Sequence, residues 1–500
     1  MEISGASYIA GQWQQSDSRQ VFFGFSPRQN QSLTTPIYEA TSQMLEDALS
    51  SSAQAFIEYR QTSFAQRATF LFAIAQEIEA LGDALLDITH EETNLPIARL
   101  QGERGRTINQ LRAFAQALEQ SHNGLLNLNV HDQADPQRIP LAKPSTQLSH
   151  LPVGVVAVFG ASNFPYAFST LGGDTASALA AGCPVIMKSH TAHPATSEMM
   201  TKAIDKAIQE TKMPKGVFSM IQAKNYDISH QLVAASQIKA VGFTGSFTVA
   251  QKLMETISKR SEQIPFYGEL GSINPQVIFA RHAELHGSEL AQQLCQSLLM
   301  GNGQFCTSPG LWLIPSNNHA FIKTAKEQLN ASQSDTLLSP NIVNSFKCSI
   351  ERLKATYGVS LIAHGQLQAE FHANAHLFST DATTYLANTS LHEEVFGPAA
   401  LIVTYENDTE LAQIVDNLDG QLTASIHGTE SDFISQNVVI EALQYKVGRL
   451  IENQMPTGVE VCASMNHGGP FPSSTDVKST SVGLNAMLRF LRPICRQRAG

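Results

Sequence analysis

One cysteine of this chain stands in a segment that suits a nucleophile. Cys306 lies in residues 303–307 (GQFCT), a short glycine-led run just past an apolar stretch. A thiolate is a strong nucleophile near neutral pH when its pKa is lowered. A buried and inert thiol is the commoner alternative for a lone cysteine, so Cys306 needs partners before it indicates an activity.

A carboxylate and an amide hold comparable places elsewhere. Glu269 lies between two glycines in residues 266–271 (FYGELG), where a carboxylate suits a general base. Asn163 follows an apolar run in residues 159–165 (FGASNFP), where its amide can donate to a developing oxyanion. The alternatives are an ordinary surface glutamate and a turn-forming asparagine.

A glycine turn at residues 242–246 (GFTGS) leads into a predicted helix. A helix N-terminus offers free backbone N–H groups and a positive dipole end, which suits a pyrophosphate. The GxGxxG fingerprint of dinucleotide-binding proteins is missing after the first buried strand. A plain N-cap at Ser246 is the alternative interpretation of this turn.

An α/β framework must position these segments. Apolar runs alternate with helical patterns, which indicates a parallel sheet with right-handed crossovers and ligands at the carboxyl ends of its strands. The predicted strands are 153–160, 184–188, 216–221 and 240–244, and the predicted helices are 166–181, 196–211 and 246–260. A second alternation after residue 274 predicts a second domain, with strands at 276–279 and 400–405 and a helix at 289–300.

The segments before the first sheet are predicted in outline. Residues 8–13 suit a hairpin with Gly11 at the bend. The pattern is helical from about residue 41 to residue 121, and Ser63 and Gln66 have the spacing of a capping box. The polar stretch at 126–149 is expected to be an exposed hairpin or arm.

Composition narrows the class of protein. Five hundred residues exceed one hydrophobic core, so at least two domains are expected. The 33 basic and 44 acidic residues give a net charge of −11, which argues against nucleic acid and anionic membranes as partners. Without a signal peptide or an apolar run of about 18 residues, a cytoplasmic protein is expected. The 16 histidines show no HExxH or paired Cys/His spacing, so no metal site is suggested.

Six motifs together resemble those of NAD(P)-dependent aldehyde dehydrogenases, in the same order and over nearly the whole chain. They are SNFP (162–165), a strand end with Lys188, GFTGS (242–246), ELG (269–271), GQxC (303–306) and EEVFGP (393–398). The resemblance implies the α/β aldehyde dehydrogenase fold, with a Rossmann-like cofactor domain at 1–126 and 149–273 and an α/β catalytic domain at 274–455. It also implies a small β oligomerisation arm and C-terminal tail at 127–148 and 456–500, and a homodimer or homotetramer.

The resemblance also implies catalytic roles. Cys306 resembles the nucleophile that attacks the aldehyde carbon, while the Asn163 amide and the Cys306 backbone N–H hold the oxyanion. Hydride transfer to the nicotinamide leaves a thioester, and Glu269 activates the water that hydrolyses it. The implied cofactor contacts are Lys188 to the adenosine ribose, Ser246 to the pyrophosphate and Glu394 to the nicotinamide ribose, with Gly245 and Phe396 among the cofactor-binding residues.

One departure from the family pattern concerns the cofactor. The family often has Lys-Pro-Ser-Glu after the second strand, and its glutamate repels a 2′-phosphate. Here residues 188–191 read KSHT, so the neutral Thr191 stands at the glutamate position. Lys224, after the third strand, adds a positive charge. We therefore expect NADP⁺ to be accepted and preferred, with NAD⁺ also usable; a merely permissive Thr191 is the alternative.

Further segments resemble one branch of the family. Residues 93–96 (TNLP), 102–107 (GERGRT) and 465–472 (MNHGGPFP) resemble the branch of the α-ketoglutaric semialdehyde dehydrogenases and the NADP-linked long-chain aldehyde dehydrogenase of luminous bacteria. A semialdehyde that carries a carboxylate needs a cation in its pocket. Arg104 is the first candidate, followed by Arg99 and Arg106. Solvated helix charges are the alternative for all three.

A long-chain aldehyde would instead need an apolar tunnel. Phe168, Phe305 and Phe471 are the candidates for its lining, and an ordinary core position is the alternative for each. His467 lies near the place of a substrate-lining aromatic residue in the family and is predicted to contact the substrate. A structural histidine is the commoner case.

The expected function is that of an NADP-accepting aldehyde dehydrogenase that forms a carboxylic acid through a cysteine thioester. The leading substrate is α-ketoglutaric semialdehyde, which gives 2-oxoglutarate. A medium- or long-chain aliphatic aldehyde is the alternative within the class. A CoA-acylating or acyl-transfer enzyme is a second alternative, against which Glu269 argues, and a binding protein that has lost activity is a third.

Overall fold

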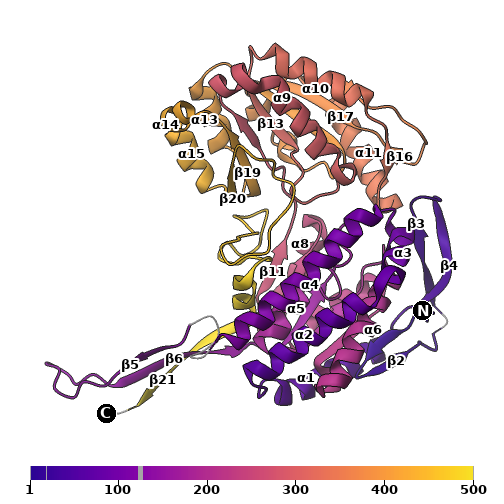
Figure 1. Cartoon of the computed structure of the whole chain (residues 1–500), viewed down its shortest axis with the longest axis vertical. Helices are drawn as coiled ribbons and strands as arrows, with labels where there is room; N and C mark the ends of the chain where they lie inside the picture. Colours follow the sequence, from indigo (N-terminus) through magenta and orange to yellow (C-terminus); the bar gives the residue numbers. More distant parts are fainter. Residues whose placement is uncertain (1, 19, 122–127, 499–500) are drawn as a thin grey trace.

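Two seven-stranded sheets organise the chain into two lobes, and a β arm projects from one of them (Figure 1). The computed structural model describes residues 2–18, 20–121 and 128–498. Both sheets are built mainly of parallel strands with helices between them, so the predicted α/β class is confirmed.

The first sheet has the strand order β11-β10-β7-β8-β9-β1-β2. Its parallel strands are β7 (Val155–Phe159), β8 (Val185–Lys188), β9 (Phe218–Ile221), β10 (Ile238–Thr244) and β11 (Phe266–Glu269). The antiparallel strands β1 (Ser7–Ile9) and β2 (Gln12–Gln14) complete one edge and form the predicted hairpin around Gly11. The four strands predicted between residues 153 and 244 are confirmed within a few residues.

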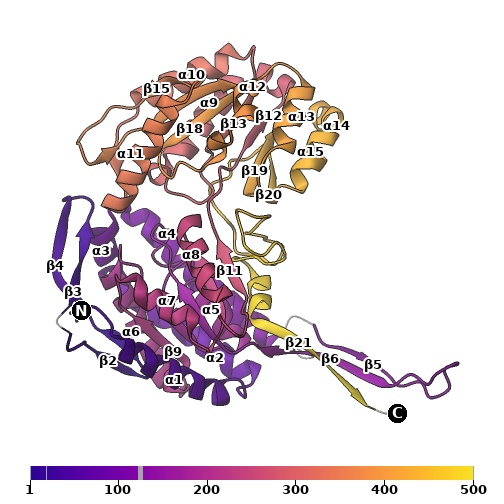
Figure 2. The ribbon, with the colours of Figure 1, turned by 180° about the vertical axis from the view of Figure 1, so that it is seen from behind.

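Alternate residues of the central strand β7 enter two different cores. Val156 and Val158 pack with helices α2 and α4, which face the viewer in Figure 1. Val155 and Ala157 pack with helices α7 and α8, which face the viewer in Figure 2. A parallel strand covered on both faces is expected to be apolar throughout, as this one is.

The helices of this lobe follow the predicted pattern with two exceptions, an unpredicted helix at residues 226–234 and a late start of the helix expected from residue 166. They are α1 (Ser42–Tyr59), α2 (Phe64–Ala80), α3 (Gly82–Thr93), α4 (Ile97–Glu119), α5 (Gly173–Ala181), α6 (Pro194–Thr211), α7 (Tyr226–Ala234) and α8 (Phe247–Ser258). The capping box at Ser63 and Gln66 is confirmed at the start of α2. The helix predicted from residue 166 begins only at Gly173. Gly172 turns so tightly that an added Cβ would lie 2.3 Å from the Ala167 carbonyl oxygen, so residues 166–172 form turns instead.

The carboxyl edge of the first sheet gathers segments that are far apart in sequence. Phe159, at the end of β7, pairs with Lys188 on one side and with Phe243 on the other. Thr244 pairs with Glu269 on the next strand. Lys188, Glu269 and the chain that leads to Asn163 therefore leave the sheet at one edge, where parallel sheets bind ligands.

The second sheet has the order β15-β17-β18-β13-β12-β19-β20 and is parallel except for its β15–β17 pair. Its strands are β12 (Gln276–Ile278), β13 (Leu311–Pro315), β15 (Ser360–His364), β17 (His376–Asp381), β18 (Ala399–Tyr405), β19 (Gln421–His427) and β20 (Val447–Glu452). Its helices are α9 (Ala280–Leu299), α10 (His319–Ala331), α11 (Pro340–Ala355), α12 (Ala382–Ala387), α13 (Asp408–Asp416), α14 (Glu430–Ser435) and α15 (Asn437–Gln444). The helix predicted at 289–300 is the second half of α9.

Two small sheets and the arm complete the chain. β3 (Val21–Ser26) pairs with β4 (Gln31–Tyr38), and β14 (Asp335–Thr336) with β16 (His372–Ala373). In the arm, β6 (Ser145–Pro152) lies between β5 (Val130–Asp132) and β21 (Leu491–Arg498) and extends away from both lobes. None of the described helices has the length and apolar character needed to cross a membrane.

The C-terminal segment has two parts. Residues 453–483 run from the second lobe back towards the first, drawn in yellow in Figure 1, and the 3₁₀ helix η5 (Leu484–Phe490) leads into the arm strand β21. The predicted arm and tail at 456–500 thus contain a stretch that lies between the lobes as well as an arm strand. Residues 122–127 and 499–500 of the predicted divisions lie outside the described residues.

Candidate active site

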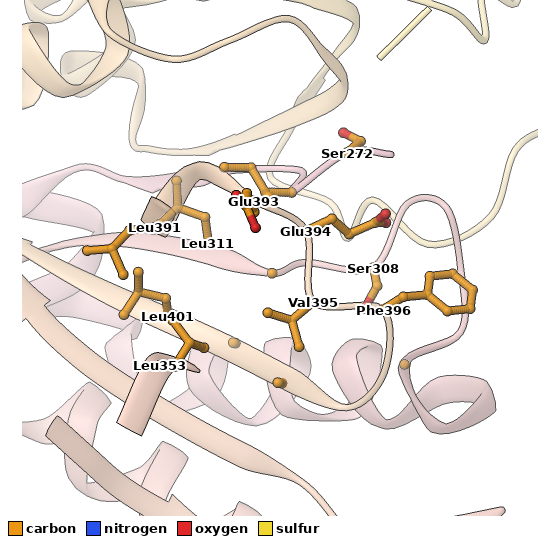
Figure 3. A pocket seen from close by; sticks show the side chains of 15 residues that line it. Ser272, Ser308, Leu311, Leu353, Leu391, Glu393, Glu394, Val395, Phe396 and Leu401 are labelled. Carbon is orange, nitrogen blue, oxygen red and sulfur yellow. The ribbon is translucent and has the colours of Figure 1, made fainter. Parts of the chain in front are cut away.

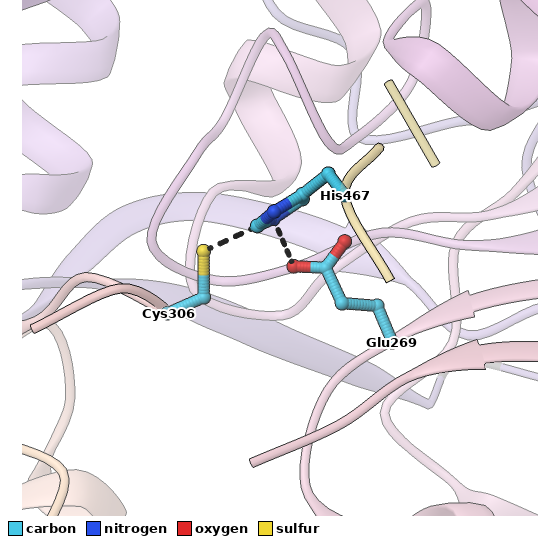
Figure 4. Close-up of side chains that lie close together, drawn as sticks. All are labelled: Glu269, Cys306 and His467. Carbon is cyan, nitrogen blue, oxygen red and sulfur yellow. Dashed lines mark hydrogen bonds and ion pairs between the residues drawn. The ribbon is translucent and has the colours of Figure 1, made fainter. Parts of the chain in front are cut away.

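Three side chains from distant segments meet between the lobes (Figure 4). Glu269 ends β11, Cys306 follows the second-lobe helix α9, and His467 belongs to the returning C-terminal segment. The Cys306 Sγ lies 3.5 Å from Nε2 of His467, and the same nitrogen lies 2.9 Å from Oε1 of Glu269. His467 and Glu269 are buried, and Cys306 is partly exposed. A thiol, an imidazole and a carboxylate therefore form one contact chain.

The loop that carries Cys306 is set by its backbone. Gly301, Asn302 and Gly303 have left-handed φ values of 57°, 51° and 71°, which turn the chain sharply after α9. Gly303 admits no side chain, because a Cβ there would lie 2.2 Å from the Gly397 carbonyl oxygen. Asn302 donates to the carbonyls of Asp335 and Ala373, which ties the turn to its surroundings.

Glu269 and His467 are held from both sides. The Ser481 hydroxyl donates to Oε2 of Glu269 at 2.6 Å, so both carboxylate oxygens have partners. The His467 N–H donates to Oγ1 of Thr480, and its carbonyl accepts the N–H of Ser481. An isolated bridge between Glu269 and Ser474 joins the C-terminal segment to the sheet edge. This folded-back segment thus places the imidazole beside the carboxylate.

The electrostatics of the centre keep the thiol protonated. Burial raises the pKa of the Cys306 thiol well above its ordinary value, and the Glu269 carboxylate raises it further, while Arg106 opposes the rise. Burial also raises the pKa of Glu269, but the His467 ring and the hydrogen bonds from His467, Ser481 and Cys306 leave it lowered. The resting pair is therefore a thiol and a carboxylate. One imidazole nitrogen within reach of both gives the thiol proton a path to the carboxylate.

Asn163 lies beside the cysteine loop. Its side-chain amide donates to the Gln304 carbonyl at 3.0 Å, and its own carbonyl accepts from Nη2 of Arg99 at 2.7 Å. The Arg99 guanidinium stacks over the rings of Phe164 and Phe305, 5.1 and 4.6 Å from their centroids. Arg99 thus supports the Asn163 backbone rather than facing open space.

Four of the predicted cofactor residues end or follow strands at the carboxyl edge of the first sheet. Lys188 ends β8, and burial lowers the pKa of its ammonium to about 8, against an opposing effect of Glu39. Thr191 follows three residues later and is partly buried. Gly245 and Ser246 are exposed at the start of α8, and Ser246 makes no side-chain cap hydrogen bond. The N-terminus of α8 is therefore available to a ligand, as a pyrophosphate requires.

Glu394 and Phe396 lie in the second lobe, in the loop before β18 (Figure 3). Burial raises the pKa of the Glu394 carboxyl to about 8, and the N–H of Ser272 opposes this rise. The carboxyl approaches the backbone at Gly271, where a Cβ would lie 2.7 Å from its Oε2. It is thus near the loop that follows Glu269.

Glu39 is a charged group near the cofactor side that the motifs do not indicate. Its carboxylate accepts the backbone N–H of Lys224 at 3.0 Å, at the start of α7, and acts electrostatically on Lys188. The side chain of Lys224 itself is exposed. Glu39 is far from both lysines in sequence, so no local pattern could have revealed it.

A cavity of ≈950 Å³ opens onto Cys306. Arg106 of the first lobe and Arg449 of the second both line it. The Arg106 Nε donates to the Val459 carbonyl at 3.2 Å, while its buried Nη1 and Nη2 have no hydrogen-bond partner among the described residues. Arg449 donates to two carbonyls of the loop at 456–458. The apolar lining residues are Phe164, Phe168, Phe305, Leu450, Ile451, Met455, Val459 and Met465.

Arg104, the first candidate for the substrate cation, does not line this cavity. Its Nη1 donates to the Gly82 carbonyl at 2.6 Å. Residues two apart on a helix point about 200° apart, so Arg106 faces the cavity when Arg104 faces α3. The helical pattern predicted for this segment is confirmed by α4. The choice of the arginine that faces the cavity was wrong. Arg106, named behind Arg104 together with Arg99, lines the cavity instead, and Arg449 was missed.

The other predicted substrate residues divide. Phe168 and Phe305 line the cavity. Phe471 does not; it is 59% exposed and packs against Phe247. His467 contacts the Cys306 thiol and the Glu269 carboxylate. The sequence predicted only a contact with the substrate for it, from its position in the family pattern.

Comparisons with known proteins agree with one another. The profile of the aldehyde dehydrogenase family matches residues 13–491. Alpha-ketoglutaric semialdehyde dehydrogenase 2 of Azospirillum brasilense is 41% identical over 499 residues, which cover 99% of this chain and 93% of that protein. Alpha-ketoglutaric semialdehyde dehydrogenase of Acinetobacter baylyi is 40% identical over 464 residues, which cover 92% of this chain and 87% of that protein.

Two solved structures have the same fold. Apo betaine aldehyde dehydrogenase of Staphylococcus aureus superposes with a TM-score of 0.84 at 19% identity, covering 99% of this chain and 96% of that one. Aldehyde dehydrogenase KauB of Pseudomonas aeruginosa gives 0.84 at 20% identity, covering 100% and 97%. At such low identity these likenesses concern the fold alone.

Proposed function

Since this chain belongs to the aldehyde dehydrogenase family and is an NAD(P)-dependent oxidoreductase, we propose that it oxidises α-ketoglutaric semialdehyde to 2-oxoglutarate. The two relatives that bear this activity in their names share about two fifths of their residues with it over most of their length. The cavity beside Cys306 supports the same substrate through its cations.

Arg106 is the observation that carries this proposal. Its Nη1 and Nη2 are buried without partners at the wall of the cavity that Cys306 lines. A buried guanidinium with free N–H groups costs folding free energy unless a ligand satisfies it. A planar carboxylate accepts two parallel N–H bonds from such a group. The semialdehyde carries one carboxylate, at the end opposite to the aldehyde.

The catalytic roles follow from the contacts of the centre. Cys306 attacks the aldehyde carbon, and its proton passes through Nε2 of His467 towards Glu269. The Asn163 amide exchanges its hydrogen bond to the Gln304 carbonyl for one to the oxyanion. The backbone N–H of Cys306 donates the second hydrogen bond to the oxyanion. The bound nicotinamide cofactor supplies the acceptor for the hydride. Glu269 releases the thiol proton to water of the cavity, and the carboxylate so restored then removes a proton from the water that hydrolyses the thioester and releases the acid.

The residues at the carboxyl edge of the first sheet fit a dinucleotide. The exposed N-terminus of α8 at Gly245 and Ser246 suits the pyrophosphate, and Lys188 suits a ribose hydroxyl. Glu394 and Phe396 would hold the nicotinamide end from the second lobe. We propose that NADP⁺ is preferred, because Thr191 is neutral and Lys224 is cationic. Glu39 acts against this preference, because it places a negative charge at the start of α7.

The β arm supports assembly into a homodimer or homotetramer. Val130, Ile139 and Leu141 expose 53%, 89% and 74% of their surface near its end. Apolar side chains on a projecting hairpin need cover from another chain. A nucleophilic thiol must stay reduced, which suits a cytoplasmic enzyme.

Steady-state kinetics, followed by the absorbance of the reduced nicotinamide, test the proposal. Wild-type enzyme is given α-ketoglutaric semialdehyde, succinic semialdehyde and a long aliphatic aldehyde, each with NADP⁺ and NAD⁺. The highest kcat/KM is expected for the keto-semialdehyde. The apolar lining of the cavity favours the long aldehyde as the second candidate, and a higher kcat/KM for it would overturn the proposed substrate. Acyl-CoA formation in the presence of CoA would overturn the hydrolytic mechanism.

A further inference from the structure

The catalytic centre also has the composition of a metal site. Cys306, His467 and Glu269 each offer one ligand atom, and the three atoms lie within 4.8 Å of one another. A sulfur, an imidazole nitrogen and a carboxylate oxygen are the donors that Zn²⁺ takes in proteins. Mg²⁺ and Ca²⁺ prefer oxygen ligands alone, so the donor set selects a softer cation.

Two of the three distances between ligand atoms are close to those around one zinc ion, and the third pair lies within 4.8 Å. Ligands at the usual Zn–S and Zn–N lengths lie about 3.5 Å apart in a tetrahedron. The Cys306 Sγ and the His467 Nε2 are already 3.5 Å apart. An imidazole nitrogen and a carboxylate oxygen on zinc lie about 3.4 Å apart, whereas Nε2 and Oε1 of Glu269 are 2.9 Å apart. A side-chain shift of about half an ångström, found by subtracting these values, brings this nitrogen and oxygen to the spacing that zinc requires.

We propose that these three side chains bind Zn²⁺ reversibly and that the bound ion switches the enzyme off. The Cys306 S–H bond breaks and a Zn–S bond forms, and the proton leaves to solvent. No electron is transferred in this exchange. A water from the cavity takes the fourth position, on the side where Cys306 is partly exposed.

The groups around the three ligands hold them in place before the ion binds, but they predict only a moderate affinity for Zn²⁺. Ser481 fixes the second carboxylate oxygen, and Thr480 fixes the backbone of His467. Such contacts orient ligands and raise metal affinity. The Nδ1 of His467, however, is buried without a partner among the described residues, and this is the atom that would normally anchor a metal-bound imidazole. A reversible inhibitor is expected rather than a permanent structural ion.

Zn²⁺ binding and the inhibition that it causes can be tested separately. A zinc ion on these atoms would occupy both the proposed nucleophile and the proposed base, so the inhibition rests on the proposed function. Binding does not, because it depends only on three ligand atoms. The sequence offers no metal motif, since the ligands come from three distant segments.

Competing sites must first be removed. His282 and His286 are one turn apart on α9, with ring centroids 5.0 Å apart, so their two imidazoles are a pair that can compete for zinc. The exposed thiols are Cys348, Cys462 and Cys495. The background protein therefore carries His286→Gln, Cys348→Ser, Cys462→Ser and Cys495→Ser, none of which touches the catalytic centre.

Calorimetric titration of this background protein with zinc chloride tests the binding. One Zn²⁺ per chain is expected, and His467→Asn or Glu269→Gln should each weaken it on the order of 100-fold. Co²⁺ should give the thiolate charge-transfer absorption, which Cys306→Ser abolishes. Unchanged affinity in both the His467 and Glu269 variants would overturn the site, because the thiol alone would then bind the ion. The absence of any binding would overturn it as well.

Activity measurements separate the two proposals. Chelator-reversible loss of aldehyde oxidation at one equivalent of Zn²⁺ supports the switch. Stoichiometric binding that leaves activity intact overturns the switch and contradicts the role of Cys306. A protein inactive on every aldehyde that still binds Zn²⁺ through Cys306 contradicts the proposed function and supports the metal site.

Discussion

The catalytic centre and the cavity beside it differ in how far their buried polar atoms have hydrogen-bond partners. In the centre, both oxygens of Glu269 have partners, and Nε2 of His467 contacts the thiol as well as the carboxylate. In the cavity, Nη1 and Nη2 of Arg106 and Nε of Arg449 are buried without partners among the described residues. Apart from Nδ1 of His467, the polar groups named in the centre have partners there, whereas the cavity keeps N–H groups free for a ligand. Under the proposed function, the centre performs the reaction and the cavity selects the aldehyde.

Removal of the nucleophile should have the largest effect. Cys306→Ser is expected to lower kcat on the order of 10⁴-fold or more for every aldehyde, because no other group can form the thioester. Stopped-flow absorbance of the reduced nicotinamide measures it, and the thermal unfolding midpoint serves as the control for folding. A variant that kept substantial turnover would show that the centre does not act through this thiol.

Interruption of the contact chain should come next. His467→Asn keeps a polar side chain but removes the nitrogen that lies between the thiol and the carboxylate, so kcat should fall about 10²- to 10³-fold. The loss should be the same for short and long aldehydes, since the centre is common to both. A fall in kcat/KM for one substrate only would instead mean that His467 belongs to the cavity.

The pH profile of the thiol sharpens the account of the centre. Burial and the Glu269 carboxylate raise the pKa of Cys306, so alkylation by iodoacetamide, which needs the thiolate, should be slow at neutral pH and quicken as pH rises. Glu269→Gln removes a negative neighbour and should move the profile to lower pH. Glu269→Asp retains the charge and should leave it nearly in place. A profile in Glu269→Gln that moved to higher pH would contradict this electrostatic account.

Cofactor variants should have the smallest effect. Thr191→Glu should raise the KM for NADP⁺ about 10-fold by repulsion of the 2′-phosphate and change that for NAD⁺ little. Glu39→Gln should act in the opposite direction, because it removes the negative charge at the start of α7. Initial rates at varied cofactor concentration measure both. A Thr191→Glu enzyme with an unchanged KM for NADP⁺ would remove the basis of the predicted preference.

Much of the fold was predictable because burial leaves a clear pattern. The strands of the first sheet are covered on both faces, so their residues form continuous apolar runs. The prediction of a helix at 166–172 was wrong because Gly172 makes a tight turn, and apolar periodicity does not reveal such a turn. The first half of α9 was missed because residues 280–288 contain few apolar residues. The family and the enzyme class predicted from six ordered motifs are confirmed.

Only those site residues that lie in local sequence motifs could be predicted. Cys306 and Glu269 sit in recognisable segments, but their contact with His467 spans 161 and 198 residues and exists only because the C-terminal segment folds back. Arg104 was chosen over Arg106 because a motif does not give the rotational phase of a helix. Glu39 and Arg449 lie in no motif; packing within the first lobe reveals Glu39, and the cavity between Arg106 and Arg449 reveals the latter.

The division of labour between centre and cavity is tested most directly by Arg106→Leu, with Arg104→Leu on the same helix as the matched control. The measured quantity is the ratio of kcat/KM for α-ketoglutaric semialdehyde to kcat/KM for an uncharged aldehyde of similar length. Arg106→Leu should lower this ratio about 10- to 100-fold, as expected for lost hydrogen bonds to a charged group, while Arg104→Leu leaves it near the wild-type value. An unchanged ratio in Arg106→Leu, or an equal fall in both variants, would contradict the account.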